Sequence, residues 1–319
     1  MAILECIPNF SEGRRPEVLQ ALAGALTRVP GVFLLDQEAD KDHNRSVFTL
    51  AGEPASVVEA AFAAAATARD LIDLRRHQGE HPRIGATDVV PLVPIEGITV
   101  AEAVELARSL GQRIARELEI PVYLYEEAAT SPARRNLADI RRGEFEGLPA
   151  KMSDPAWAPD FGAPAPHPSA GATVVGVRKP LVAFNVYLDT KDVKVAKAIA
   201  KAVRGSSGGL VGVKALGFEI AERGCVQVSM NLVDLDATPI YRAYELVRIE
   251  ARRFGVNVLD SEIVGLVPER ALVDTVRYYL GLAGFRDDQV LEARLGKAQR
   301  LGAAMVPDAG PGGGRETGG

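Results

Sequence analysis

Apolar positions along this 319-residue chain follow two periods, one of two residues and one of three to four, which distinguish strands from amphipathic helices. In the first half they predict a strand ILECIPNF, a helix over 16–28, strands GVFLLDQEAD and RSVFTLAG joined by the polar turn KDHN, a helix over about 54–76, a strand VVPLVPI, a helix over 100–118 and a strand PVYLYE. This order contains β-α-β-β-α-β.

The same order recurs in the second half with different residues. The pattern predicts a strand LVAFNVYL, a helix DTKDVKVAKAIAKAVR, strands KALGFEIAERG and CVQVSMNLVD, a helix over 238–254, a strand NVLDSEIVGLVP and a helix over about 268–282. Because this is the split βαβ order, we expect an α+β fold with two ferredoxin-like subdomains packed around a substrate groove. The expected subdomains span residues 1–172 and 173–300.

Two stretches lack an apolar period. Residues 148–173 are rich in proline, which opposes regular structure, so we expect them to form an irregular connection that lines the groove between the halves. Residues 301–319 are rich in glycine and proline, and we expect a disordered tail.

Composition narrows the class of protein. The net charge is −5 and basic residues are interleaved with acidic ones, so the basic stripe of a nucleic-acid-binding protein is missing. No apolar run approaches the roughly 20 residues of a membrane span, and the first residues lack the layout of a signal peptide. Cys6 and Cys225 both lie in apolar alternating stretches. We therefore expect a soluble cytoplasmic protein with reduced, buried thiols.

Two of the four histidines, His77 and His81, lie in the stretch RRHQGEHPRIGATD. His-x-x-Glu-His is an inverted zinc-protease pattern, but Gly79 and Pro82 interrupt the helix that this pattern requires, so we expect no metal. His77 could instead cap a helix end near residue 77. For His81, in an irregular segment beside charged residues, a titrating acid/base role is favoured over capping.

Other polar residues are weaker candidates for substrate binding. Arg83 could hold a carboxylate in a bidentate manner, a role that requires arginine. Each of the others also has a structural reading, such as a solvated turn, a start of a helix or a water-facing charge. The candidate substrate-binding residues are Asn9, Asp40, Arg45, Arg83 and Arg178.

Several long motifs, in the same order, carry a resemblance to a known family. They are CIPNFSEGR, HQGEHPRIGATDVVPLVPI, GQRIARELEIPVYLYEEAA, RRGEFEGLP, WAPDFG, GATVVGVRKPLVAFNV, VSMNLVD and IVGLVP. Together they resemble the formiminotransferase domain of glutamate formiminotransferases over about residues 2–283. No cyclodeaminase domain follows, so the chain is similar to the stand-alone form.

The resemblance implies a folate-dependent transferase that moves the formimino group of N-formimino-L-glutamate to N5 of tetrahydrofolate and releases L-glutamate. Tetrahydrofolate is then a co-substrate, no metal takes part, and a homodimer is expected. In that family the histidine before Pro-Arg is the general acid/base, which corresponds to His81. The family's folate-binding segment corresponds to Gly162, Ala163, Pro164, Ala165, Pro166, His167, Pro168, Ser169, Ala170 and Gly171.

Residue chemistry is compatible with these assignments. One imidazole can take the proton that N5 loses and return it to the departing nitrogen of glutamate. Glycines at the ends of the 162–171 loop would let its backbone approach a ligand closely. Three alternatives stay open, namely N-formylglutamate as the donor, a non-catalytic folate-binding protein on the same scaffold, and a metallohydrolase.

Overall fold

The computed structural model describes residues 2–301 and divides the chain into two compact units, Met1–Val182 and Ala183–Gly319. Each unit combines one β-sheet with helices, so the predicted α+β class is confirmed. The predicted tail, 301–319, lies outside the described residues except for residue 301, which ends the last helix. None of the helices within residues 2–301 has both the length and the apolar character needed to cross a membrane.

The sheet of the first unit has a ferredoxin-like centre. Its strands are β1 (Ile3–Cys6), β2 (Asn9–Phe10), β3 (Val32–Asp40), β4 (Arg45–Gly52), β5 (Thr87–Glu96), β6 (Val122–Glu126) and β7 (Thr173–Val177). β3 pairs with β4, β4 with β1, and β1 with β5, all antiparallel, while the short β2 also lies between β4 and β5. β7 and β6 extend this sheet by parallel pairing beyond β5.

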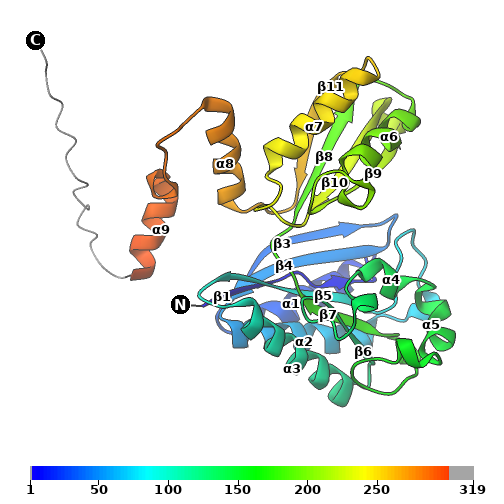
Figure 1. Ribbon diagram of the computed structural model, residues 1–319. Coiled ribbons are helices and arrows are strands. Elements are labelled where there is room, and N and C mark those ends of the chain that lie inside the picture. The colour runs from blue at the N-terminus through cyan, green and yellow to red at the C-terminus, as the bar shows by residue number, and fades with distance from the viewer. Residues whose placement is uncertain (1, 302–319) are drawn as a thin grey trace, which may run out of the picture. The chain divides into compact units, whose positions relative to one another are not determined.

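One face of this sheet is covered by α1 (Pro16–Thr27), α2 (Pro54–Leu71) and α3 (Val100–Leu118), as Figure 1 shows. Apolar side chains repeat on the inner face of each helix, for example Leu22, Ala61 and Leu110, and they are almost completely buried. Burying a leucine contributes about 1.5–3 kcal/mol, so these stripes fix the helices on the sheet. Polar residues, among them Arg45 at the start of β4 and Asp88 near the start of β5, lie at one end of these strands.

The proline-rich stretch differs from its predicted role as a connection between the halves. α4 (Leu137–Arg141) and α5 (Glu144–Met152) precede it and overlap its start, with Pro149 inside α5. Residues further along bond to the first unit, since the N–H groups of Asp160 and Phe161 donate to the Val122 carbonyl. Buried apolar groups on α5 and β6 explain this docking. The stretch therefore belongs to the first unit.

The boundary between the units follows Val182 instead of residue 172. The reason is β7, which the sequence prediction assigned to the second half. β7 pairs with both β5 and β6, so it completes the first sheet.

The second unit contains the predicted β-α-β-β-α-β order. Its elements are β8 (Val182–Leu188), α6 (Val193–Val203), β9 (Val213–Ile220), β10 (Cys225–Leu232), α7 (Ile240–Arg253), β11 (Val258–Val264), α8 (Glu269–Leu280) and α9 (Leu291–Leu301). The four strands lie in the order β11-β8-β10-β9, which is the ferredoxin-like order. Cys225 in this unit and Cys6 in the first are buried free thiols, as predicted.

Candidate functional site

The two neighbouring histidines lie in irregular backbone. α2 ends at Leu71, five residues before the predicted helix end at residue 76, and a single 3₁₀ turn (Leu74–Arg76) follows before β5 begins. Ile72, directly after the helix, is buried and extended, which turns the chain away from the helix axis. His77 and His81 therefore do not share a helix face, the geometry that the zinc-protease pattern needs.

His77 is the C-cap of this 3₁₀ turn, where its N–H donates to the Leu74 carbonyl at 3.2 Å, and its ring links two further segments. Its Nε2 atom lies 2.8 Å from the carbonyl oxygen of Asn44, and its Nδ1 atom accepts a hydrogen bond of 3.1 Å from Nε of Arg83. The second contact requires an unprotonated Nδ1, so Nε2 carries the proton and donates to Asn44. Burial lowers the pKa of His77, and the charge of Arg83 acts in the same direction. His77 is thus a neutral bridge.

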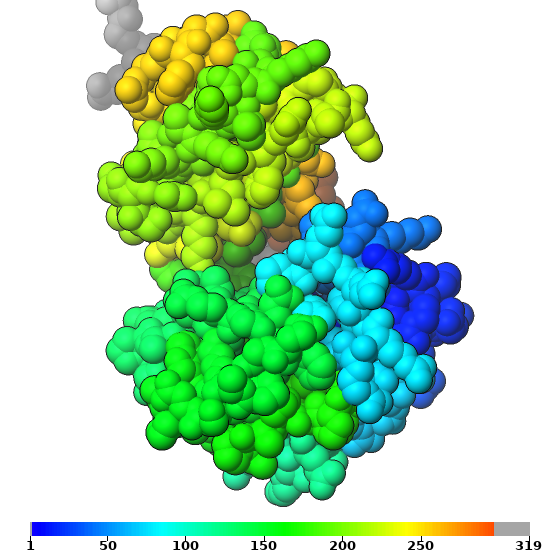
Figure 2. Space-filling view, turned by 90° about the vertical axis from the view of Figure 1, so that its right-hand side faces the viewer, coloured from blue at the N-terminus to red at the C-terminus, as the bar shows by residue number. Residues whose placement is uncertain are grey.

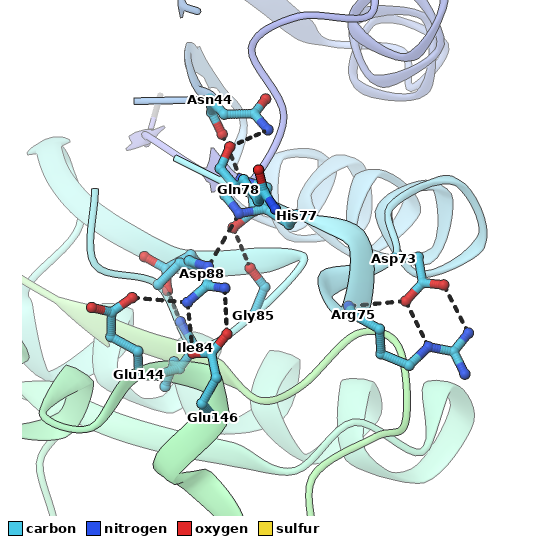
Figure 3. Close-up of polar contacts among 12 residues, drawn as sticks. Asn44, Asp73, Arg75, His77, Gln78, Ile84, Gly85, Asp88, Glu144 and Glu146 are labelled. Atoms are coloured by element: carbon cyan, nitrogen blue, oxygen red, sulfur yellow. Dashed lines mark hydrogen bonds and ion pairs between the residues drawn. The ribbon is translucent and has the colours of Figure 1, made fainter. Parts of the chain in front are cut away.

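The guanidinium group of Arg83 is bonded to neighbouring side chains. It is 8 % exposed and forms ion pairs with Glu144 (2.8 Å) and Glu146 (2.7 Å), two residues at the start of α5. Figure 3 shows these two carboxylates converging from the α5 segment beneath His77. The Arg83 carbonyl also accepts a bond from the Phe145 N–H at 2.9 Å. We call Arg83, His77, Glu144 and Glu146 the Arg83 cluster.

A polar cavity of about 510 Å³ lies against this cluster, lined by residues 77–79, Arg83, Gly143 and the two glutamates. The two segments that line it lie side by side on the face of the first unit seen in Figure 2. Because the donors of Arg83 are engaged by His77 and two carboxylates, the arginine would have to release a partner before it could hold a substrate carboxylate. The geometry therefore favours a structural role for Arg83.

His81, four residues after His77, is half-buried. Burial lowers its pKa to about 4, and the positive charges of Arg45 and Arg141 contribute to the shift. Its ring lies 6.2 Å from the ring of His43, edge to face. Asp40 in turn accepts a 2.7 Å hydrogen bond from Nδ1 of His43. At neutral pH the His81 imidazole is uncharged and able to accept a proton.

Arg45 is the first residue of β4. Its NH2 group donates to the Oδ1 atom of the buried Asn9, whose own amide donates to the Ile7 carbonyl at 2.7 Å. The Nε atom of Arg45 is buried and has no hydrogen-bond partner among the described residues. Burial lowers the pKa of Arg45 to about 10, with a further contribution from the charge of Arg141. Arg45 therefore stays charged but incompletely paired.

Asp88 and Arg141 complete the surroundings of His81. Asn9 pairs with Val89 and Phe10 with Thr87, so Asp88 is the extra residue of a β-bulge in β5. Asp88 is 3 % exposed. Its carboxylate accepts a hydrogen bond of 2.8 Å from the Ile84 N–H and forms an ion pair with Arg141 on α4.

The Nε atom of Arg141 is buried without a partner among the described residues, as in Arg45. We call His81, Arg45, Asp88 and Arg141 the His81 cluster. Arg141 pairs with the single buried carboxylate of the cluster, and the charge of Arg45 is acted on by this carboxylate and by the more exposed carboxylates of Glu38 and Asp40. The arrangement offers a neutral base next to positive charge that an anion could balance.

The predicted folate loop, residues 162–171, adjoins the backbone that follows His81. The Ala172 N–H donates to the Ile84 carbonyl and the Ala86 N–H to the Ala170 carbonyl, each at 2.9 Å. Within the loop, His167 and Gly171 exchange backbone hydrogen bonds, and His167 Nδ1 accepts the Ala170 N–H at 3.0 Å. The loop end is thereby bonded to the backbone of residues 84 and 86, while residues 162–165 are exposed.

The two loop glycines have a conformational reason to be glycine. Gly162 and Gly171 have positive φ angles, +91° and +69°. A Cβ atom on Gly171 would lie 2.1 Å from the Ile84 carbonyl oxygen. Close approach of a ligand is therefore not needed to explain them, and adding bulk at Gly171 would disturb the fold.

The structure brings together four of the residues expected from sequence. Asn9, Asp40 and Arg45 lie around His81 directly or through His43. Arg178 does not lie among them. Its N–H donates to the carbonyl of Leu92, which is four residues, or about 13 Å of strand, further along β5 than Asp88.

Sequence reasoning missed the roles of Asp88, Arg141 and His43. Arg141 and Asp88 lie within the quoted motifs RRGEFEGLP and HQGEHPRIGATD. A charged residue in an otherwise apolar strand, as Asp88 is, was the available signal.

Comparison with known proteins gives consistent matches along the chain. The formiminotransferase domain, N-terminal subdomain, matches residues 3–178, and the formiminotransferase domain matches residues 183–293. A glutamate formimidoyltransferase of Streptococcus pyogenes is 51 % identical over 92 % of this chain and 98 % of its own length. One from Thermoplasma acidophilum is 48 % identical over 94 % of this chain and 100 % of its own. The formimidoyltransferase-cyclodeaminase of Rattus norvegicus is 46 % identical over 87 % of this chain and 52 % of its own.

Proposed function

Because this chain belongs to the formiminotransferase domain family, we propose that it transfers the formimino group of N-formimino-L-glutamate to N5 of tetrahydrofolate. The products are 5-formiminotetrahydrofolate and L-glutamate. The chain is thus an enzyme, a transferase of a one-carbon group. The observation that carries the mechanism is the half-buried, neutral His81, shortly before the backbone to which the end of the folate loop is bonded.

His81 would act as a proton shuttle. N5 of tetrahydrofolate attacks the formimino carbon, the new N5–C bond forms, and the proton of N5 passes to the imidazole. The bond between that carbon and the glutamate nitrogen then breaks, and the imidazolium returns the proton to the departing nitrogen. A pKa lowered by burial and by two arginines keeps His81 in the base form needed for the first step.

The loop 162–171 would bind the folate. Its support is the resemblance together with the position of its last residues, which bond to residues 84 and 86 and so hold the loop close to His81 along the backbone. The exposed residues 163–165 leave backbone groups accessible to a ligand. The glycines at its ends would act by shaping the loop.

An assay of the folate product tests the proposal. The purified chain should convert tetrahydrofolate with N-formimino-L-glutamate to a product identified by its absorbance and mass. N-formyl-L-glutamate, offered in parallel, tests the alternative donor, in which oxygen replaces NH. Folate binding without turnover of either donor would instead support a non-catalytic folate-binding protein.

Three further expectations complete the proposal. The protein would work in the cytoplasm, as a homodimer, and without a metal. The last rests on His77, whose two ring nitrogens are both engaged in hydrogen bonds and so are not available as ligands.

A further inference from the structure

We propose that Arg141, together with Arg45, binds the α-carboxylate of the donor beside His81. This inference rests on the proposed function and adds a substrate-binding residue that sequence reasoning did not identify. It also identifies a donor feature required for recognition, namely a free carboxylate on the α-carbon, which bears the nitrogen that carries the transferred group.

Arg141 is held in place from both ends of its side chain. At the backbone, the Lys151 ammonium donates to the carbonyls of Asp139 and Ile140, each at 2.6 Å, and of Arg142 at 3.2 Å, which fixes the end of α4. At the tip, one guanidinium nitrogen pairs with the buried Asp88. Such pre-organisation is typical of arginines that recognise carboxylates, because little side-chain freedom is lost on binding.

Arg45 supplies the second positive group. It lies two residues after His43, whose ring contacts the ring of His81, and its tip is oriented by Asn9. Arg45 and Arg141 lie close enough for each charge to act on His81, while Asp88 is the one buried carboxylate near them and Glu38 and Asp40 are exposed. The buried, unpartnered Nε atoms of both arginines show that the cluster does not satisfy itself internally. An added carboxylate would lower the energy of both.

Donor chemistry decides which carboxylate fits. His81 has to protonate the glutamate nitrogen, and the α-carbon joins that nitrogen directly to the α-carboxylate. The γ-carboxylate is separated from the nitrogen by a flexible chain and can lie elsewhere. When His81 is close enough to protonate the nitrogen, the α-carboxylate is necessarily near the groups that surround His81, which are Arg45 and Arg141. Binding it would also offset the positive charge that disfavours protonation of His81.

Three donors and one substitution test the assignment. They are N-formimino-L-glutamate, 4-formiminoaminobutanoate, which lacks the α-carboxylate, and N-formimino-L-2-aminobutanoate, which lacks the γ-carboxylate. For both donors with an α-carboxylate, Arg141→Gln should lower kcat/KM about 10- to 100-fold, as expected for a charged hydrogen bond. For 4-formiminoaminobutanoate the substitution should change kcat/KM less than about twofold, because the group that Arg141 binds is already missing.

Matched variants separate binding from structure. Arg142→Gln, at the exposed position that directly follows α4, should leave kcat/KM for all three donors unaffected. Arg141→Lys should recover part of the loss, because it keeps the charge but not the planar fork. An equal loss of kcat/KM with all three donors would overturn the proposal and make Arg141 a support for Asp88 alone.

The wild-type enzyme decides the matter if Arg141→Gln does not fold. It should use 4-formiminoaminobutanoate at least about tenfold less efficiently than N-formimino-L-2-aminobutanoate. Equal use of these two donors would reject α-carboxylate recognition. Failure of the proposed function itself is distinguishable, because the wild type would then show no turnover with N-formimino-L-glutamate.

Discussion

Two arginine clusters share the segment of residues 77–88, and they differ in how well their charges are paired. In the Arg83 cluster a guanidinium meets two carboxylates and a neutral imidazole. In the His81 cluster two guanidinium groups meet a single buried carboxylate, and two buried Nε atoms lack partners. The presence of an arginine in the sequence does not distinguish the two clusters. The pairing of its guanidinium donors in the structure does.

This difference in pairing separates arginines with a structural role from arginines with a functional role in one small region. A satisfied guanidinium fixes segments that are remote in sequence, here residue 83 and the start of α5. An unsatisfied one raises the energy of the free protein and is retained where a ligand compensates for it. Changes in the Arg83 cluster should therefore affect stability, and changes in the His81 cluster should affect turnover.

The largest effect is expected from the two histidines, one in each cluster. His81→Ala should lower kcat/KM by about 10²–10⁴, the usual contribution of a general acid/base, while folate binding persists. His77→Ala should change kcat/KM far less, because its ring only bridges Asn44 and Arg83. Steady-state kinetics and folate titration of both purified variants measure the contrast.

Near-wild-type turnover of His81→Ala would contradict the proton-shuttle role. Equal losses in both variants would show that the two clusters work as one site. Circular dichroism of both variants controls for unfolding.

The order of strands and helices could be predicted from the sequence, because periodic apolar faces report local structure. The ferredoxin-like order in both units was confirmed. Helices α4 and α5 were not predicted. Only the end of α5 falls in the stretch that its prolines marked as irregular, and Pro149 is accommodated there. The expected groove between the halves stays a prediction.

The candidate site was predicted less completely than the fold. His81 and the 162–171 loop rested on the resemblance, and Arg45 on its place at a hairpin turn. Arg141 and Asp88 meet only through tertiary contacts, 53 residues apart in the chain, and no local period reports such a pairing. The same holds for Arg83 and Glu146, which are 63 residues apart in the chain.

A medium effect is expected on stability when the Arg83 cluster is broken. Arg83→Met should lower the free energy of unfolding by about 1.5–3 kcal/mol, because a mostly buried guanidinium loses charged hydrogen bonds while its exposed glutamate partners return to water. As a control, Arg135→Met removes an exposed ion pair with Glu127 and should cost at most about 1 kcal/mol. Urea unfolding measures both.

Acid should shrink the difference between Arg83→Met and the wild type. The hydrogen bonds from Arg83 hold the pKa of Glu146 below its ordinary value, so their contribution is present at neutral pH and is lost as the pH falls through that lowered pKa. A large loss of kcat/KM in Arg83→Met with unchanged stability would place Arg83 in substrate binding after all.

The smallest effect concerns the ionisation of His81 in the free protein. Burial and the charges of Arg45 and Arg141 lower the pKa of His81 to about 4, in contrast to the near-neutral titration expected from an ordinary histidine. The imidazole should therefore stay neutral from pH 8 down to about 5 and gain its proton only as the pH falls through about 4. Proton NMR can follow this, because the chain has only four histidines and His81→Gln identifies the signal.

Two substitutions turn this titration into a test of the comparison. Arg141→Gln removes one of the positive charges and should raise the pKa of His81, although burial should keep it below the ordinary histidine value of about 6.5. Arg83→Met should leave the pKa of His81 unchanged, since the charges that act on His81 are those of Arg45, Arg141 and Asp88. Titration of wild-type His81 at its ordinary value, or an equal shift in both variants, would show that the two clusters do not differ electrostatically.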